Sequence, residues 1–204
     1  ELRIYAIGRK EKSMKYVIFG AGLQGRIVGY DILNFDKGSE VIYADVDKEN
    51  LKLAKKIVGT KRTRFEECDI YKEAESLKLM KESDVIIICL PHDSPTTATV
   101  YKRLAKAKGK KAVLSDYWMW REHHEHHDAL VKAEVLAIPG LGIAPGFANI
   151  CVGQLAYEFD KIDEAYIYVG GLPVERGVFP VDYMELFNLD AMLDMYITPS
   201  TVIE

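Results

Sequence analysis

The sequence predicts an α/β protein with a doubly wound parallel sheet, followed by the beginning of a second domain of α+β type. Short apolar runs rich in strand formers alternate with segments of helical periodicity between residues 14 and 139. This alternation is typical of a parallel sheet covered by helices on both faces. After that, PGLGIAPGFANI at 139–150 packs three glycines and two prolines into one stretch. Such a density of turn residues marks a domain junction or a backbone that approaches a ligand.

The glycine-rich stretch KYVIFGAGLQGR carries the first functional prediction. A buried strand expected at 16–19 runs into Gly20, Gly22 and Gly25, in the spacing G-x-G-x-x-G. In a Rossmann-type fold these glycines make the tight turn, let a pyrophosphate approach the backbone, and let the helix pack on the strand. The N–H groups at the start of that helix then hold the phosphates. The predicted cofactor-binding residues are Gly20, Gly22, Leu23, Gln24, Gly25, Asp45, Val46, Asp69, Leu90 and Pro91.

An acidic residue at the end of the second strand supports a dinucleotide site. Asp45 ends the strand expected at 41–45, about 20 residues after the glycine turn, where the ribose hydroxyls of a dinucleotide lie. Asp47 competes for this role, but it also stands where it can cap the next helix. No Arg or Lys stands directly beside Asp45 to bind a 2'-phosphate. We therefore expect NAD as the cofactor rather than NADP.

The first two helices are predicted from apolar residues at helical spacing. In the helix after the glycine turn, Ile27, Tyr30 and Leu33 are expected to pack on the sheet. The second helix is expected to begin after its cap at Asp47 and to end at Gly59.

The remaining elements of the first domain follow the same alternation of strand and helix. Further strands are expected at 63–68, 84–90, 112–115 and 135–138, and further helices at 71–81, 94–109 and 119–133. After residue 139 we expect a helix from about Gly146, strands at 164–169 and 183–186, a short helix capped by Asn188 and an extended piece at 200–203. The predicted organisation is an N-terminal extension at 1–13, a dinucleotide-binding domain at 14–139 and a partial second domain at 140–204. Met14 is a candidate natural start, and an edge strand at 2–7 is the alternative for the extension.

Composition narrows the class of protein. A net charge of -4 and a pI near 5.8 give no general attraction to nucleic acid. No apolar run reaches the length needed to cross a bilayer. The three cysteines are widely spaced in apolar surroundings and are interpreted as reduced core thiols, so a cytoplasmic location is expected.

The run from His123 to His127 could bind a metal on one helix face, but we interpret it as a polar surface and predict no metal site.

Several longer motifs make a family resemblance specific. They are VIFGAGLQG at 17–25, DVIIICLPH at 84–92, LGIAPGFAN at 141–149, YIYVGGLP at 166–173 and the closing LDMYITPSTVIE. With these motifs the chain resembles the saccharopine dehydrogenase and L-lysine dehydrogenase family, with the archaeal type of lysine dehydrogenase as the nearer match. The resemblance implies an NAD(P)-linked oxidoreductase that oxidises the C–N bond of an amino acid by hydride transfer to nicotinamide.

The resemblance also directs attention to residues at the strand ends. His92 and Asp116 follow the fourth and fifth strands and are the candidates for proton transfer or substrate orientation. The alternative is that His92 only lines the cofactor and Asp116 only braces the loop at 139–149. For substrate binding the candidates are Gly146, Asn149 and Arg176.

Members of this family run further than residue 204, so the chain is expected to be truncated at its C-terminus and its own activity is in question. A homodimer through the second domain is expected. Two other functions stay open: a dinucleotide-binding module without turnover, and an enzyme similar to carboxynorspermidine synthase on the same fold.

Overall fold

The computed structural model describes residues 13–91, 94–114 and 120–170, together with positions 193 and 197. The chain divides into two compact units, Glu1–Phe159 and Asp160–Glu204. The boundary predicted after residue 139 therefore falls inside the first unit. The predicted edge strand at 2–7 lies outside the described residues, as does every element predicted after residue 170 apart from the isolated positions 193 and 197.

The first unit contains a six-stranded sheet in the order β3-β2-β1-β4-β5-β6, with every neighbouring pair parallel. The strands are β1 (Lys15–Phe19), β2 (Glu40–Asp45), β3 (Thr63–Glu67), β4 (Val85–Ile88), β5 (Lys111–Leu114) and β6 (Leu136–Pro139). The helices are α1 (Leu23–Phe35), α2 (Lys48–Val58), α3 (Glu73–Glu82), α4 (Ser94–Ala107), α5 (Trp120–Lys132) and α6 (Phe147–Ala156). This arrangement confirms the predicted doubly wound sheet.

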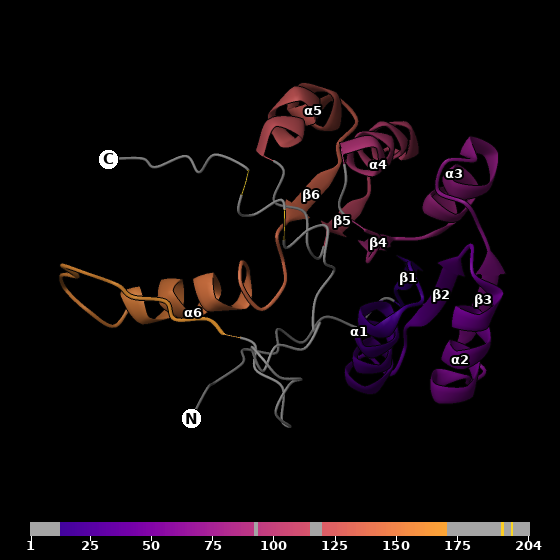
Figure 1. Ribbon diagram of the computed structural model, residues 1–204, viewed down its shortest axis with the longest axis horizontal. Coiled ribbons are helices and arrows are strands. Elements are labelled where there is room, and N and C mark those ends of the chain that lie inside the picture. Colours follow the sequence, from indigo (N-terminus) through magenta and orange to yellow (C-terminus); the bar gives the residue numbers. More distant parts are fainter. Residues whose placement is uncertain (1–12, 92–93, 115–119, 171–192, 194–196, 198–204) are drawn as a thin grey trace. The chain divides into compact units, whose positions relative to one another are not determined.

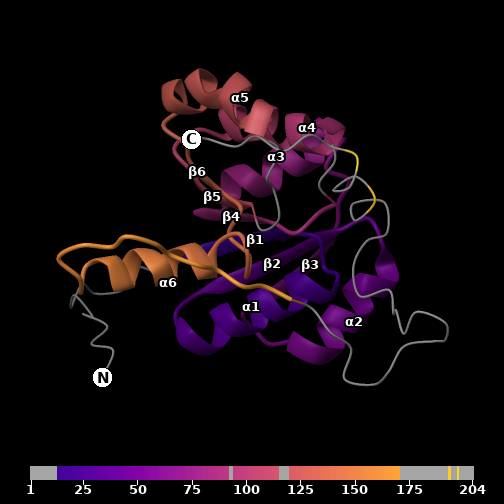
Figure 2. The same cartoon turned by 60° about the vertical axis from the view of Figure 1, so that its left-hand side comes forward.

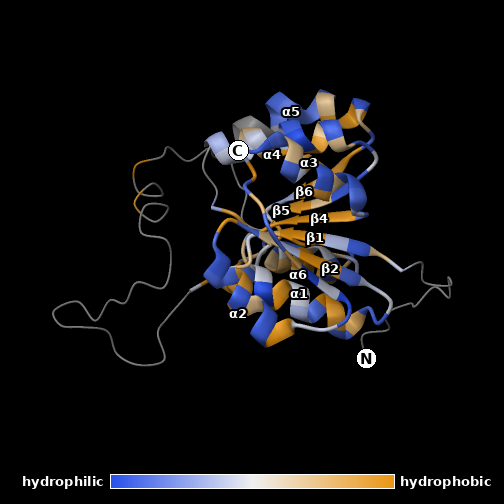
Figure 3. Ribbon diagram, turned by 90° about the vertical axis from the view of Figure 1, so that its right-hand side faces the viewer, coloured by the Kyte–Doolittle hydropathy of each residue, from blue (hydrophilic) through white to orange (hydrophobic). Residues whose placement is uncertain are grey.

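Two hydrophobic clusters lie on the two faces of the sheet, because successive strand residues point to opposite sides. Val17 and Phe19 of β1 face one cluster, which α3, α4 and α5 cover. Ile18 of β1 faces the other cluster, which α1 and α2 cover. Figures 1 and 2 show α1 and α2 on one side of the sheet and α3, α4 and α5 on the other. The central strands between them are largely hydrophobic (Figure 3), whereas the edge strand β3, TRFEE, is mostly polar.

The sheet-facing side of α1 differs from the prediction. Ile27 and Tyr30 are 67% and 53% exposed, whereas Gly25, Gly29 and Leu33 are buried. A Cβ atom on Gly29 would overlap the hydroxyl of Tyr43, which β2 points at the helix. The expectation that Ile27 and Tyr30 pack on the sheet is therefore wrong. Helix α1 turns Gly29 to the sheet because the side chain of Tyr43 already fills the space between the helix and the strands.

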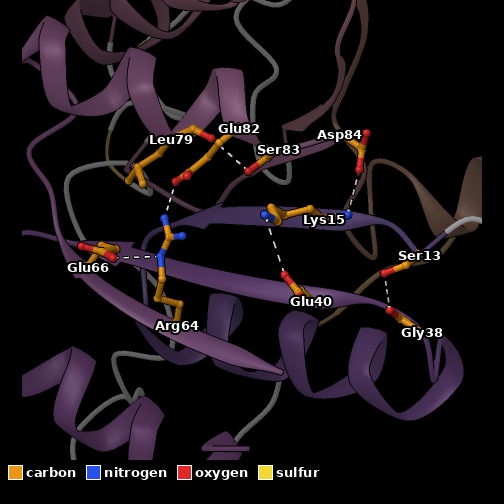
Figure 4. Close-up of polar contacts among 10 residues, drawn as sticks. All are labelled: Ser13, Lys15, Gly38, Glu40, Arg64, Glu66, Leu79, Glu82, Ser83 and Asp84. Atoms are coloured by element: carbon orange, nitrogen blue, oxygen red, sulfur yellow. Dashed lines mark hydrogen bonds and ion pairs between the residues drawn. The ribbon is translucent and has the colours of Figure 1, made fainter. Parts of the chain in front are cut away.

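Polar contacts hold the amino end of the sheet, opposite the glycine turn. Lys15 N donates to Asp84 Oδ2 at 3.0 Å, which links the start of β1 to the residue before β4. The Lys15 ammonium lies 3.8 Å from a carboxylate oxygen of Glu40 in β2 (Figure 4). At the edge strand β3, Arg64 pairs with Glu66 and Glu82. The Lys15 contacts link β1 to β2 and to the start of β4, whereas the Arg64 pairs lie within β3 and between β3 and α3.

Residues 160–170 belong to the second unit. The strand predicted at 164–169 is not formed among the described residues, where these positions are exposed and pair with no other strand. An extended segment needs a partner to become a strand, and a single alternating pattern supplies none. Among the described residues, no helix has both the length and the apolar character that a membrane crossing needs.

Candidate dinucleotide-binding site

The glycine turn lies at the carboxyl end of β1, between β2 and β4. The strand order reverses at β1, which makes this the topological switch point where ligands bind in open α/β sheets. Gly20 has φ +98°, and its N–H donates to Ala44 O at 2.8 Å. A Cβ atom there would overlap Cys89 O and lie 2.8 Å from Cys89 C. Gly20 is therefore required both by its backbone angle and by the adjacent end of β4.

The third glycine of the motif has a packing role. A Cβ atom on Gly25 would overlap Gly20 O and lie 3.2 Å from the Ile18 side chain. The first turn of α1 can therefore approach the end of β1 only because Gly25 has no side chain. This is the role that the spacing predicts for it.

Gly22 differs from both of these glycines. It is the N-cap of α1, with φ -69° and ψ -162°, angles open to any residue. A Cβ atom on Gly22 would meet nothing within 4 Å. Neither backbone strain nor packing among the described residues therefore demands a glycine at this position. The space in front of it is open, at a helix N-terminus whose first turn has no acidic residue.

Asp45 is 9% exposed, and its carboxylate is already hydrogen-bonded. Oδ2 accepts from Ala21 N at 2.6 Å, and Oδ1 accepts from Asp47 N at 2.8 Å. Asn50 Nδ2 lies 3.4 Å from Oδ2. Asp47 caps α2 by accepting from Glu49 N at 2.8 Å, as the sequence predicts. Sequence reasoning did not single out Ala21, because its contribution is a backbone N–H that no side-chain pattern reveals.

The other predicted cofactor residues lie at the same end of the sheet with differing exposure. Leu23 and Val46 are 80% and 61% exposed, and Pro91 is also exposed. Leu90 packs partly against the core. Asp69 follows the edge strand β3, and its Oδ1 accepts from Tyr71 N at 2.9 Å. Asp69 therefore forms a local turn, two strands away from the glycine turn.

The predicted substrate and catalytic residues are only partly described. His92, Asp116 and Arg176 lie outside the described residues. Gly146 has φ +126° and is the N-cap of α6, and its N–H donates to Asn149 Oδ1 at 3.0 Å. A Cβ atom on Gly146 would lie 2.6 Å from the backbone nitrogen of Gly142. Both residues therefore have a structural task at the start of α6.

Other candidate groups give no further site. No group of three or more His, Cys, Asp or Glu side chains suited to a metal occurs in the part of the chain that the structure describes. The ring of His126 lies 5.5 Å from that of Tyr101, centroid to centroid. Cys68 is buried, and desolvation is the main reason that the pKa of its thiol rises to about 11.

Comparison with known proteins supports the fold. No protein-family model matches the sequence. Among solved structures, the chain is similar to apo saccharopine dehydrogenase (L-Glu forming) from Saccharomyces cerevisiae, with TM-score 0.60 and 20% identity over 71% of this chain. It is also similar to GenD2 from gentamicin A biosynthesis in complex with NAD, with TM-score 0.52 and 14% identity over 72% of this chain. A third similar structure is the WlbA dehydrogenase from Chromobacterium violaceum in complex with NADH and UDP-GlcNAcA, with TM-score 0.50 and 17% identity over 64% of this chain.

These likenesses define the class as a Rossmann-type α/β fold. The chain spans 31%, 40% and 36% of the length of the saccharopine dehydrogenase, GenD2 and WlbA chains, respectively.

Proposed function

We propose that this chain binds NAD at the glycine turn and forms the dinucleotide-binding part of an oxidoreductase of the saccharopine or lysine dehydrogenase type. The reaction is oxidation of an amino acid's C–N bond, with hydride transfer to the nicotinamide. The observation that carries the binding step is the open space at Gly22. The residues around the turn suit a dinucleotide, since N–H groups and a helix N-terminus face the space that a pyrophosphate needs.

The contrast among the three glycines supports this function. Gly20 and Gly25 are explained by the packing of the turn itself. No described atom of the protein explains why residue 22 is a glycine. A ligand in contact with the backbone at this position would explain it. A side chain at Gly22 would project into the space where phosphate oxygens contact the helix N-terminus.

The charges near Asp45 support NAD over NADP. Its carboxylate would repel a 2'-phosphate. The next cation along the chain, Lys48, lies 3.1 Å from Glu67 Oε2, and both side chains are exposed. Lys48 therefore already has an anionic partner in an adjacent element. NAD-bound and NADH-bound structures among the similar proteins agree with a nicotinamide dinucleotide.

The amino-acid substrate rests on the sequence motifs, together with the likeness to saccharopine dehydrogenase. In this proposal His92 and Asp116 transfer protons or orient the amine, while Gly146, Asn149 and Arg176 bind the substrate. The proposal includes a cytoplasmic location and a homodimer through residues after 139. In α6, Phe147, Ile150 and Leu155 are exposed apolar residues that association could cover.

Fluorescence titration of the 204-residue chain with NADH tests the binding step. Gly22→Val should abolish NADH binding without unfolding, because the branched side chain fills the open space. Gly153→Val in α6 is the matched control, since a Cβ atom there also meets nothing within 4 Å. Unchanged NADH affinity in the Gly22 variant would show that the phosphates lie elsewhere.

A second measurement separates the enzyme from the alternatives. Amine-dependent NADH production should be assayed with lysine, saccharopine and polyamines as substrates. Turnover of lysine or saccharopine supports the proposed reaction, and polyamine turnover supports the carboxynorspermidine-synthase type. NADH binding without any turnover favours a dinucleotide-binding module.

A further inference from the structure

Asp45 links three parts of the candidate site through one carboxylate. Its Oδ2 accepts from Ala21 N in the glycine turn at 2.6 Å, and its Oδ1 accepts from Asp47 N before α2 at 2.8 Å. The amide of Asn50, within α2, lies 3.4 Å from Oδ2. The side chain therefore ties the β1–α1 turn to the β2–α2 junction.

The contact with Ala21 matters most for the shape of the turn. Ala21 has no exposed surface, so in the folded protein the carboxylate, and not water, is the acceptor for its N–H. The preceding N–H, of Gly20, donates to Ala44 O at 2.8 Å. Two successive N–H groups of the turn are thus held by the end of β2. The residue that follows them is Gly22, where the space for the phosphates begins.

These contacts use most of the carboxylate's capacity. An ionised carboxylate offers about four acceptor sites on its two oxygens. Ala21, Asp47 and Asn50 occupy three of them. One acceptor site on Oδ1 remains for a ribose hydroxyl, and a second hydroxyl would have to displace Asn50 from Oδ2. Most of the carboxylate's hydrogen-bonding capacity is therefore used within the protein.

We propose that Asp45 is a positioning residue for the phosphate cradle, in addition to any contact with ribose. By accepting from Ala21 N, it holds the glycine turn in the conformation that presents Gly22 and the start of α1 to a phosphate. This inference rests on the proposed function and deepens it. Its consequence is that Asp45 affects the binding of ligands that have no adenosine ribose.

Two substitutions separate positioning from direct contact. Asp45→Ala removes every side-chain acceptor and leaves Ala21 N without a partner. Asp45→Asn keeps one oxygen, which can still accept from the buried Ala21 N while its NH₂ group turns toward Asp47. Asp47 is exposed, so water can accept from its N–H. The Asn variant should therefore retain the turn, and the Ala variant should lose it.

Binding is measured with NADH, NADPH and reduced nicotinamide mononucleotide, which has one phosphate and no adenosine. If Asp45→Ala leaves one molecule in ten with a competent turn, the dissociation constant of the mononucleotide rises about tenfold. The constant of NADH should rise further, because a ribose contact is lost as well, and that of NADPH should rise less, because the charge repulsion is also removed. For the mononucleotide, Asp45→Asn should stay within about threefold of the wild type, since it keeps the Ala21 acceptor. Asp47→Asn is the matched control, because it removes a neighbouring charge without touching Ala21 and should leave mononucleotide affinity unchanged.

Hydrogen exchange of the Ala21 amide, followed by NMR in the unliganded chain, tests the contact without a cofactor. Protection should be lost in Asp45→Ala and kept in Asp45→Asn and Asp47→Asn. If the Ala variant does not fold, Asp45→Ser takes its place, because its single hydroxyl is too short to span the same contacts.

Two results would overturn the inference. One is unchanged protection of the Ala21 amide from hydrogen exchange in Asp45→Ala, or in Asp45→Ser where that variant replaces it. The other is unchanged mononucleotide affinity with equal gains in NADPH affinity for Asp45→Ala and Asp45→Asn, which would mean that Asp45 acts only through charge and ribose. If the wild type binds none of the three nucleotides, the proposed function fails, while the exchange measurement still decides whether Asp45 holds the turn.

Discussion

Gly29 of α1 packs against the hydroxyl end of Tyr43 in β2. A Cβ atom on Gly29 would overlap Tyr43 Oη and lie 2.5 Å from Tyr43 Cζ and 2.9 Å from Ile18 Cδ1. Tyr43 is fully buried, and its ring is stacked on that of Phe65 at 5.4 Å between centroids. The tyrosine therefore cannot move away to admit a methyl group. This contact sets how closely α1 approaches the sheet, and hence where its N-terminus lies.

Gly29→Ala should destabilise the fold by about 1–3 kcal/mol, the usual cost of overpacking a core. The measurement is chemical denaturation followed by circular dichroism. Adding Tyr43→Phe to Gly29→Ala should recover part of the loss, because it removes Oη but leaves Cζ in place. The control Gly153→Ala adds a methyl group in open space on α6, where alanine is favoured by up to about 1 kcal/mol. Equal stability changes in the two helices would contradict this account of α1.

Arg62 anchors the C-terminal end of α1 from the segment before β3. Its guanidinium donates to Leu33 O at 2.7 Å, Asp36 O at 3.0 Å and Ser39 O at 3.1 Å. Hydrogen bonds to a charged group contribute about 1.5–3 kcal/mol. We expect Arg62→Ala to lower the free energy of unfolding by an amount in this range.

Lysine cannot reproduce the forked geometry of arginine, so Arg62→Lys should recover only part of the stability. The matched control is Arg64→Ala in β3. Arg64 is partly exposed in its pairs with Glu66 and Glu82, and exposed pairs contribute about 0–1 kcal/mol. Urea denaturation of the three variants compares them, and an Arg64 variant as unstable as Arg62→Ala would refute the anchoring role.

We expect the protein to bind NADH more tightly than NADPH. The Asp45 carboxylate can accept from a ribose hydroxyl through the remaining site on Oδ1, but it repels a 2'-phosphate. Because a hydrogen bond to a charged group contributes about 1.5–3 kcal/mol, NADH should bind at least about tenfold more tightly than NADPH. Isothermal titration calorimetry at fixed ionic strength measures both constants. Equal or tighter NADPH binding would exclude the proposed selectivity.

Cys68 should resist alkylation in the folded protein. It is 4% exposed, and burial raises the pKa of its thiol to about 11. Because the raised pKa keeps the thiol protonated at pH 8, the reactive thiolate is scarce and also shielded. Mass spectrometry after iodoacetamide treatment should find Cys68 unmodified at pH 8 and modified after unfolding in urea. Half-buried Cys151 serves as the comparison, and native labelling of both at equal rates would contradict the prediction.

The sequence by itself determined the sheet and the location of the candidate site. Buried strands and glycine turns can be predicted from residues that are close in the sequence. The apolar run at β1 and the spacing of Gly20, Gly22 and Gly25 are patterns of this kind. The position of Asp45 at the end of β2 follows from the same periodicity. The segment predicted as a strand at 164–169 has no partner strand in the part of the chain that the structure describes, and an alternating pattern does not by itself supply one.

Only the tertiary structure decided how these parts meet. The side of α1 that faces the sheet depends on the bulk of Tyr43, which comes from another strand. Likewise, the contact of Asp45 with Ala21 N joins residues 24 positions apart, through a backbone group that every residue except proline carries. Such contacts arise from packing between elements, so the spacing of residue types along one element does not reveal them.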